Sequence, residues 1–273
     1  MSETLLAIGA LLLGFVVQAV LRRVVPLCSK SVPPAAARLV QAAELLVAFL
    51  VVGAATGSGH DQELAARVPL LATFVMVGLA AARLCAVLGL RAMMHGDLTE
   101  GMSVANLAAA LVIAGHVLAT GMIAAAVFVG DAWGDLGVSL LFFAIGQVSL
   151  HLLVWLFRLL TVYDDRQEID DGNVAAAVAH AGLSVGVGVL VAHAAAGEYL
   201  GFADSMREYG LALVEAVALL VLRQFVLQTL VLGQAPRLRG GLLDERVVAH
   251  DVGAGALEAA VYIGAALWVG AVL

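Results

Sequence analysis

Eight long apolar stretches follow one another along this chain, and only short polar connections separate them. They are residues 4–25, 35–56, 64–90, 104–130, 136–162, 174–197, 209–233 and 247–273. A helix that rises 1.5 Å per residue needs about 20 apolar residues to cross a hydrocarbon core about 30 Å thick. The pattern therefore predicts an all-α, polytopic integral membrane protein with about eight transmembrane helices.

Composition excludes the soluble classes. Hydrophobic residues make up 63% of the 273 residues and charged residues 13%, whereas soluble domains are roughly 45–50% apolar. A β-barrel is also excluded, because its strands are about 10 residues long and alternate in polarity. The first stretch is long and has neither a basic lead-in nor a small-residue cleavage site, so we expect a retained membrane helix in the lipid bilayer. Most carboxylates behind the net charge of -7 lie in the connections, and no nucleic-acid partner is predicted.

Every second apolar stretch begins with a related motif of small residues. The copies begin at Pro34, Asn106, Asn173 and Asp251, and the clearest reads Asn-Val-Ala-Ala-Ala. The chain is thus predicted to be four helical hairpins that share one orientation, which are parallel repeats about the membrane normal and favour a ring or a pore. We expect two four-helix membrane units, residues 1–132 and 133–273.

The distribution of basic residues predicts the orientation of the helices. Basic residues beside cytoplasmic loops outnumber those on the other side in membrane proteins. Ten of them lie at or beside the connections after the first, third, fifth and seventh stretches: Arg22, Arg23, Lys30, Arg38, Arg91, Arg158, Arg166, Arg237, Arg239 and Arg246. Only Arg67 and Arg207 lie beside the opposite connections. Both termini are therefore expected outside the cell.

Each motif helix carries one ionisable residue at a similar depth. Seven or ten positions past the start of the motif stand Glu44, His116, His180 and Glu258. Positions three apart share a helix face, and ionisable residues at membrane depth usually face the bundle interior. If the four repeats surround one axis, these side chains converge. They could relay protons, since His titrates near neutrality, bind a divalent metal, or pair only to hold helices together.

Further polar residues could support this set. Asn173 with His180, and Asp251 with Glu258, form stripes on single helix faces because seven residues are close to two turns. A charged residue in mid-span is expected to pair or to line water, and Glu258 is the partner that we expect for Arg223. The supporting residues are Asn106, Asn173, Asp251, His151, Glu215 and Arg223.

Catalytic signatures do not occur in the sequence. It has no nucleophile and base pair, no His-Glu-x-x-His motif and no Gly-rich phosphate loop. Gly182 to Gly188 is not a dinucleotide fingerprint, because it lies inside a membrane helix with no preceding strand. Cys28 and Cys85 are isolated and have no ligand-like spacing. We predict neither an enzyme nor a bound cofactor.

The third motif copy also resembles a known family. The run Glu-Ile-Asp-Asp-Gly-Asn-Val-Ala-Ala-Ala at residues 168–177, followed by Ala181-Gly182 and Gly186, is similar to the signature of the domain of unknown function 350, the YjfL-like bacterial inner membrane proteins. Its members typically have four helices, so the resemblance implies two such units in tandem. It also implies an inner-membrane location and loosely suggests envelope-stress partners, but no activity.

Two functional hypotheses follow. The first is a small channel or transporter for protons or cations, with Glu44, His116, His180 and Glu258 as the conducting set. The alternative is a non-conducting membrane scaffold that recruits envelope-stress proteins through its cytoplasmic turns, residues 164–171 and 237–246. A monomer or a homodimer fits either hypothesis.

Overall fold

The structure, a computed structural model, describes residues 3–27, 33–58, 63–94, 107–197, 199–235, 237 and 239–272, apart from the side chains of residues 93, 94, 216, 217, 219–224 and 272. All regular elements in these ranges are helices, which confirms the all-α prediction. They are α1 (Glu3–Val24), α2 (Pro34–Thr56), α3 (Leu64–Met94), α5 (Leu107–Val127), α6 (Asp135–Arg158), α7 (Asp165–Asp170), α8 (Val174–Ala195), α9 (Phe202–Gln224), the π-helix η1 (Phe225–Val231), α10 (Leu242–Val248) and α11 (Val252–Val272).

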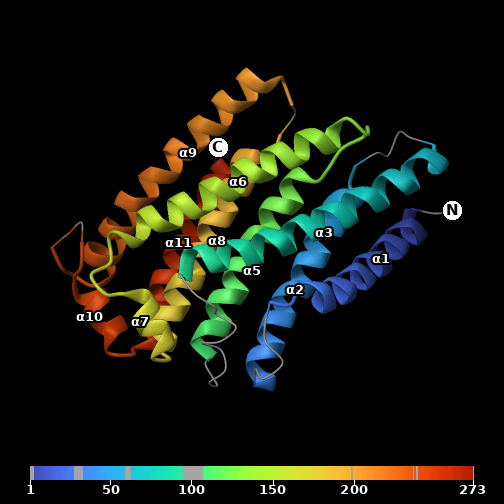
Figure 1. The fold of residues 1–273 in the computed structure, drawn as a ribbon. Helices are drawn as coiled ribbons and strands as arrows, with labels where there is room; N and C mark the ends of the chain where they lie inside the picture. Colours follow the sequence, from blue (N-terminus) through green and yellow to red (C-terminus); the bar gives the residue numbers. More distant parts are fainter. Residues whose placement is uncertain are drawn as a thin grey trace.

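Seven of the described helices are long and apolar enough to cross a membrane: α1, α2, α3, α5, α6, α8 and α11. The predicted stretch at 209–233 is helical as well, but it belongs to α9 and η1, which are not among the seven. The place of this segment in the chain, between α8 and α11, still requires it to run from one end of the bundle to the other. Both α8 and α11 start at the end that holds α7 and α10, so the chain between them must return there along α9 and η1 (Figure 1).

The four motif helices form the interior of the protein as an open row. In this row α5 packs between α2 and α8, and α8 packs between α5 and α11 (Figure 1). The first helices of the hairpins cover the row from outside, where α3 contacts α2 and α5, α6 contacts α5 and α8, and α9 contacts α8 and α11. One chain therefore places α2 and α11 at the two ends of the row, not side by side as a ring of four would.

Small residues allow the four motif helices, α2, α5, α8 and α11, to approach one another closely; these are the inner helices. A methyl group on Gly115 of α5 would lie 2.7 Å from Cα of Ala181 on α8. One repeat later, Gly182 of α8 meets Ala259 of α11 in the same way. Lipid-embedded helices associate through such small residues, because lipid tails supply no hydrophobic drive between them.

A second pair of contacts confirms the register of the repeats. Val47 of α2 packs on Gly121 of α5, and Ala119 of α5 packs 2.6 Å from the position of a Cβ on Gly188 of α8. Aligning the four motif starts makes Val47 equivalent to Ala119, and Gly121 equivalent to Gly188. The degenerate first copy is therefore correctly aligned on Pro34.

The short helices α7 and α10 lead into α8 and α11 through the same turn. Gly172 (φ 84°) follows α7 and His250 (φ 62°) follows α10, both in the left-handed region. The next residue donates its N–H to a carbonyl five residues back, from Asn173 to Glu168 at 2.8 Å and from Asp251 to Arg246 at 3.0 Å. This is the Schellman helix end, which normally places glycine where His250 stands.

We expect His250→Gly to stabilise the protein by about 0.5–1 kcal/mol, because a left-handed backbone strains any residue that has a Cβ. Thermal unfolding in detergent, followed by tryptophan fluorescence, measures the effect. Gly172→Ala at the equivalent position should shift the midpoint the opposite way. A lower midpoint for His250→Gly would show that the imidazole makes a contact that outweighs the backbone strain.

Candidate functional site

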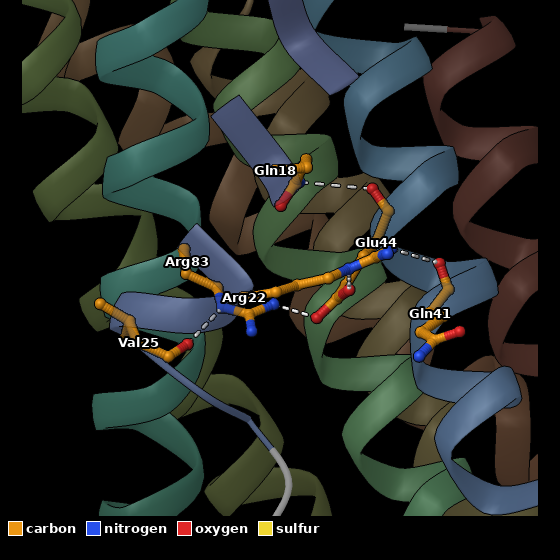
Figure 2. Close-up of polar contacts among 6 residues, drawn as sticks. All are labelled: Gln18, Arg22, Val25, Gln41, Glu44 and Arg83. Carbon is orange, nitrogen blue, oxygen red and sulfur yellow. Dashed lines mark hydrogen bonds and ion pairs between the residues drawn. The ribbon is translucent and has the colours of Figure 1, made fainter. Parts of the chain in front are cut away.

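Glu44 is the centre of an ion-paired cluster that joins the first three helices. Its carboxylate, which is buried, receives hydrogen bonds from the Arg22 guanidinium of α1 and the Arg83 guanidinium of α3 (Figure 2). Arg83 Nε also donates to the carbonyl of Val25 at 2.8 Å, and Gln18 Nε2 donates to the carbonyl of Glu44 at 3.3 Å. Glu44 therefore holds α1 and α3 against α2.

The arginine partners of Glu44 are absent from the predicted site. In the sequence, Arg22 serves only as a topological signal, and no pattern assigns Arg83 to the site. One sequence signal for this cluster was available, since Gln18 and Arg22 are four residues apart and share one face of α1. With two guanidinium partners, Glu44 is an anchor between helices, and this distinguishes it from the histidines of the site.

Two imidazoles, the buried His116 and the partly buried His151, pack against each other. His116 of α5 is 0% exposed, and its ring lies edge-on to that of His151 on α6, with 5.2 Å between the ring centroids. His151 Nδ1 lies 2.6 Å from the carbonyl oxygen of Gln147. Because a carbonyl can only accept, Nδ1 carries the proton and Nε2 of a neutral ring is left as an acceptor. Neither Nε2 of His151 nor either ring nitrogen of His116 has a hydrogen-bond partner among the described residues.

Gly89 of α3 makes room for this pair. A Cβ at Gly89 would meet Nε2 of both His116 and His151. We expect Gly89→Ala to destabilise the protein by about 1–3 kcal/mol, because the buried rings must move to admit the methyl group. Chemical unfolding in detergent measures the loss, and Gly9→Ala, where nothing lies within 4 Å of the new Cβ, is the matched control. Equal stability of the two variants would contradict the close approach of Gly89 to the rings.

His180 joins α8 to the end of α6 and to α7. Its Nδ1 is hydrogen-bonded to the guanidinium of Arg158, which also pairs with the carboxylate of Asp165. A guanidinium has only donors, so Nδ1 accepts and the proton of the neutral His180 ring lies on Nε2. That Nε2 is buried and has no hydrogen-bond partner among the described residues.

The remaining predicted residue, Glu258 of α11, is buried beside the same guanidinium. Glu258 is 2% exposed and interacts electrostatically with Arg158. His180 and His116 are also close enough to interact electrostatically. The structure thus groups His116, His180 and Glu258 around His151 and Arg158, while Glu44 belongs to the cluster of α1, α2 and α3.

Asn173 is a structural residue that fastens three helices. It is 0% exposed, and its side-chain oxygen accepts the N–H groups of Ala175 and Ala176 at the start of α8, at 3.0 and 3.2 Å. Its amide nitrogen donates to Glu168 of α7 at 2.6 Å and to the carbonyl of Val247 in α10 at 2.8 Å. Three of these bonds are local and the fourth reaches α10, so this residue positions the start of α8, the helix of His180.

The other supporting residues differ in what they do. Asp251 caps α11 by accepting the N–H of Ala254 at 3.2 Å. Glu215 lies on α9 and is partly buried. Asn106 and the side chain of Arg223 lie outside the described part of the chain, so the expected pair between Arg223 and Glu258 stays a prediction.

Two pockets open at opposite ends of α6. One of about 410 Å³ lies beside α7 and is lined by residues that include His151, Arg158, Asp165 and His180. The other, of about 770 Å³, lies between the connections at the far end and is lined by residues that include Asp131, Asp135, Ser139, His193, Glu208 and Phe142. His151 and His180 can thus be reached from the α7 end.

A file of side chains on α6 runs between the two pockets. Ser139, Phe143, Gln147 and His151 are spaced by four residues, which places them on one helix face. Gln147 Oε1 accepts the hydroxyl of Thr120 of α5 at 3.4 Å. Phe143 interrupts the polar file, and its ring packs 5.4 Å from that of Phe128. Along this face of α6, polar side chains therefore lie on both sides of Phe143, with Ser139 on one side and Gln147 and His151 on the other.

No group of three or more metal-ligating side chains is assembled in the described ranges. Among the site residues, Glu44 and Asp165 pair with arginines and His180 binds a guanidinium. Guanidinium partners repel a divalent cation, so the arrangement is better suited to moving protons among imidazoles and carboxylates.

Comparisons with known proteins place part of the chain in a family. The sequence model of the family described as Domain of Unknown Function (DUF350) matches residues 131–273. No curated protein and no solved structure matches the chain. The matched range runs from α6 to α11 and contains His151, Arg158, His180 and Glu258.

Proposed function

Because the chain belongs to the Domain of Unknown Function (DUF350) family, which is named without an activity, we propose a function from its own geometry: it is a multi-pass membrane protein that passes protons across the bilayer. The proton path runs along α6, from the pocket beside α7 through His180, His151 and His116. It continues through Gln147 and past Phe143 to the pocket at the other end.

A single observation carries this proposal. Three histidines, the buried His116 and His180 and the partly buried His151, have buried ring nitrogens without hydrogen-bond partners among the described residues, and His151 and His180 line a pocket. A buried polar atom without a partner is destabilising by about 1–3 kcal/mol. Such an arrangement persists where the free nitrogen is needed, and an imidazole that binds and releases a proton near neutral pH needs one.

Protons fit this path better than metal cations. A cation needs a continuous water-lined passage or a set of oxygen ligands, whereas a proton can move along hydrogen-bonded side chains. Phe143 and Phe128 close the described path to ions, and Arg158 places a positive charge beside His180. Of the two permeant species that the sequence allows, protons and cations, the geometry thus favours the proton.

Arg158 and Glu258 have defined roles in this proposal. The guanidinium of Arg158 donates to Nδ1 of His180, so the neutral ring carries its proton on Nε2. The ring takes up a second proton at Nδ1, when the guanidinium releases that atom, and then gives up the proton on Nε2. The carboxylate of Glu258 balances the guanidinium inside the membrane, where an uncompensated charge is destabilising. Together they orient one tautomer of His180.

We also propose that the protein lies in the bacterial inner membrane with both termini outside. Ten basic residues against two favour this orientation, and the pocket beside α7 would then face the cytoplasm. Cysteines introduced at Ser58 and Val162 in a background without native cysteines would test it with a membrane-impermeant maleimide in intact cells. Labelling is expected at residue 58 alone, and labelling at residue 162 alone would reverse the orientation.

Proton flux into proteoliposomes tests the function. We expect His116→Gln with His180→Gln to lower proton flux at least tenfold, because glutamine keeps polarity but does not bind and release a proton near neutral pH. A vesicle-entrapped pH-sensitive dye reports the flux after a potassium potential is imposed with valinomycin.

His250→Asn is the control for that measurement. It removes an imidazole from an exposed turn outside the path, and asparagine tolerates the left-handed backbone there. Its flux should equal that of the wild type. Wild-type flux retained in a folded double variant would exclude the histidines from the path, and the non-conducting scaffold would then be favoured.

A further inference from the structure

The inner row consists of α2, α5, α8 and α11. The outward faces of its two end helices, α2 and α11, are exposed, whereas the equivalent faces within the row are covered by a neighbouring inner helix. Each inner helix packs on the next through a leading face, which is Ala43 and Val47 on α2, Gly115 and Ala119 on α5, Gly182 and Gly186 on α8, and Ala260 and Gly264 on α11. It is buried on α2, α5 and α8, where it meets the next helix. On α11 this face meets no described helix, and Ala260 and Gly264 are exposed.

The receiving face shows the complementary exposure at the other end. It is Ala42 and Phe49 on α2, Ala114 and Gly121 on α5, Ala181 and Gly188 on α8, and Ala259 and Ala266 on α11. It contacts the preceding inner helix through Gly121, Gly188 and Ala259, whereas on α2 no described inner helix packs against it. Ala42 is exposed there, and Phe49 is 51% exposed.

Helix α1 contacts only one described inner helix, α2, whereas each of the other outer helices, α3, α6 and α9, contacts two. The other outer helices each lie between two consecutive inner helices, as α3 does between α2 and α5. α1 contacts α2 and α3, and no other described inner helix covers its remaining side. That side is apolar, and Leu12 and Val16 are 61% and 60% exposed. An inner helix packed on the receiving face of α2 would cover part of α1 as well.

The residues at the two free faces are compatible in size. Where α2 meets α5, the bulky Val47 of the leading face packs on Gly121. At the free faces the large residue is on the receiving face instead. Gly264 of the leading face would meet Phe49, and Ala260 would meet Ala42. Each contact pairs a large side chain with a small one or two small ones, as helix packing in membranes requires.

We propose that a second copy of this chain docks here, with the leading face of α11 against α2 and α1 of its neighbour, so that the inner row continues from one copy into the next. All four repeats share one orientation, and the two copies therefore sit the same way up in the bilayer. Such a head-to-tail contact is heterologous, and a heterologous contact forms rings when its rotation closes. The proposal does not depend on proton transfer.

Disulfide trapping tests the contact in native membranes. Ala42→Cys and Ala260→Cys would be introduced separately, with Cys28→Ser and Cys85→Ala, into two differently tagged copies that are expressed together. Ala260 and Ala42 are equivalent to Ala43 and Ala114, two alanines on the facing sides of α2 and α5, so the new Cβ atoms are expected within disulfide range, about 4 Å apart. Oxidation with copper phenanthroline should give a dimer that carries both tags.

Three controls make the result decisive. Ala42→Cys with Leu152→Cys, a position that is 57% exposed on α6, should give no mixed dimer. Ala260→Cys alone should not cross-link to itself, and a strong homodimer there would replace the head-to-tail contact with a symmetric one between two α11 helices. Absence of the mixed dimer in membranes, with a monomeric mass in mild detergent, would overturn the proposal and leave lipid as the occupant.

A bulky residue in the leading face provides a second test. No atom lies within 4 Å of a Cβ at Gly264, so Gly264→Leu fits inside a single chain. It should lower the yield of mixed dimer at least tenfold while the thermal midpoint of the protein stays unchanged. Gly137→Leu on α6, where nothing lies within 4 Å either, is the matched control. Equal yields from the two variants would exclude Gly264 from the contact.

Discussion

Replacement of Glu44 by alanine is expected to destabilise the protein by about 3–5 kcal/mol, one of the two largest effects on stability that the structure predicts. Two guanidiniums, those of Arg22 and Arg83, bind this carboxylate, and Arg83 has only 4% of its side chain exposed. Removing one partner of a buried ion pair leaves the other charge uncompensated, which is the costly case. Denaturant unfolding in detergent measures the change.

An exposed ion pair provides the comparison for Glu44. Arg166 and Asp170 lie 3.8 Å apart on α7, and their side chains are 50% and 54% exposed. Arg166→Ala should therefore change stability by less than about 0.5 kcal/mol. Glu44→Ala with an equally small effect would mean that the cluster does not hold α1 and α3 to α2. Folded Glu44→Gln protein should also keep its proton flux, because this residue lies outside the path.

Replacement of Phe143 by alanine is expected to raise proton flux by about tenfold or more. Phe143 is 3% exposed and separates the polar file at Gln147 and His151 from the pocket that contains Ser139. Truncation of its ring leaves a space next to polar side chains, and such a space can hold water that bridges them. Dye-loaded proteoliposomes with an imposed potential report the change.

Loss of stability must be separated from this gain of flux. Truncating a buried aromatic side chain is destabilising by about 3–5 kcal/mol, so Leu79→Ala on α3 serves as a control with a buried truncation outside the path. Leu79 is 0% exposed. Leu79→Ala should leave the flux at its wild-type level. An equal rise in both variants would show that the flux comes from general loosening of the bundle.

Much of the fold can be predicted from hydrophobic length and small-residue spacing. Apolar stretches locate the long helices, and the motif starts at Asn173 and Asp251 coincide with the caps of α8 and α11. The stretch at 209–233 is harder to assign, because Glu208 and Glu215 lower the apolarity of α9 and the helix widens to a π-helix at Phe225. The path of the chain between α8 and α11 identifies it as a crossing.

The candidate site was only partly predictable. The spacing of the motifs places His116 and His180 at similar depth, and the structure brings them together with His151. The arginines could not be assigned in the same way, because each long side chain reaches a partner on another helix: Arg83 reaches Glu44, 39 residues away. Periodicity describes which face of a helix is polar, but the partner on the next helix depends on how the helices pack.

The open arrangement of the inner helices could not be predicted from the sequence either. Four parallel repeats are compatible with a closed ring or with an open array, because both use the same helix faces. The contacts of Gly115 with Ala181 and of Gly182 with Ala259 show one interface used in succession. Whether such a row closes depends on the small rotation between repeats, which a sequence pattern does not specify.

Proton entry into vesicles that hold the purified wild-type protein tests the central claim most directly. With a potassium potential, negative inside, and equal pH on both sides, the proposed path predicts acidification of the lumen well above that of protein-free vesicles. It also predicts that the rate falls at least tenfold when both His116 and His180 are glutamine. A wild-type rate equal to that of empty vesicles, with the protein folded and inserted, would contradict proton transfer.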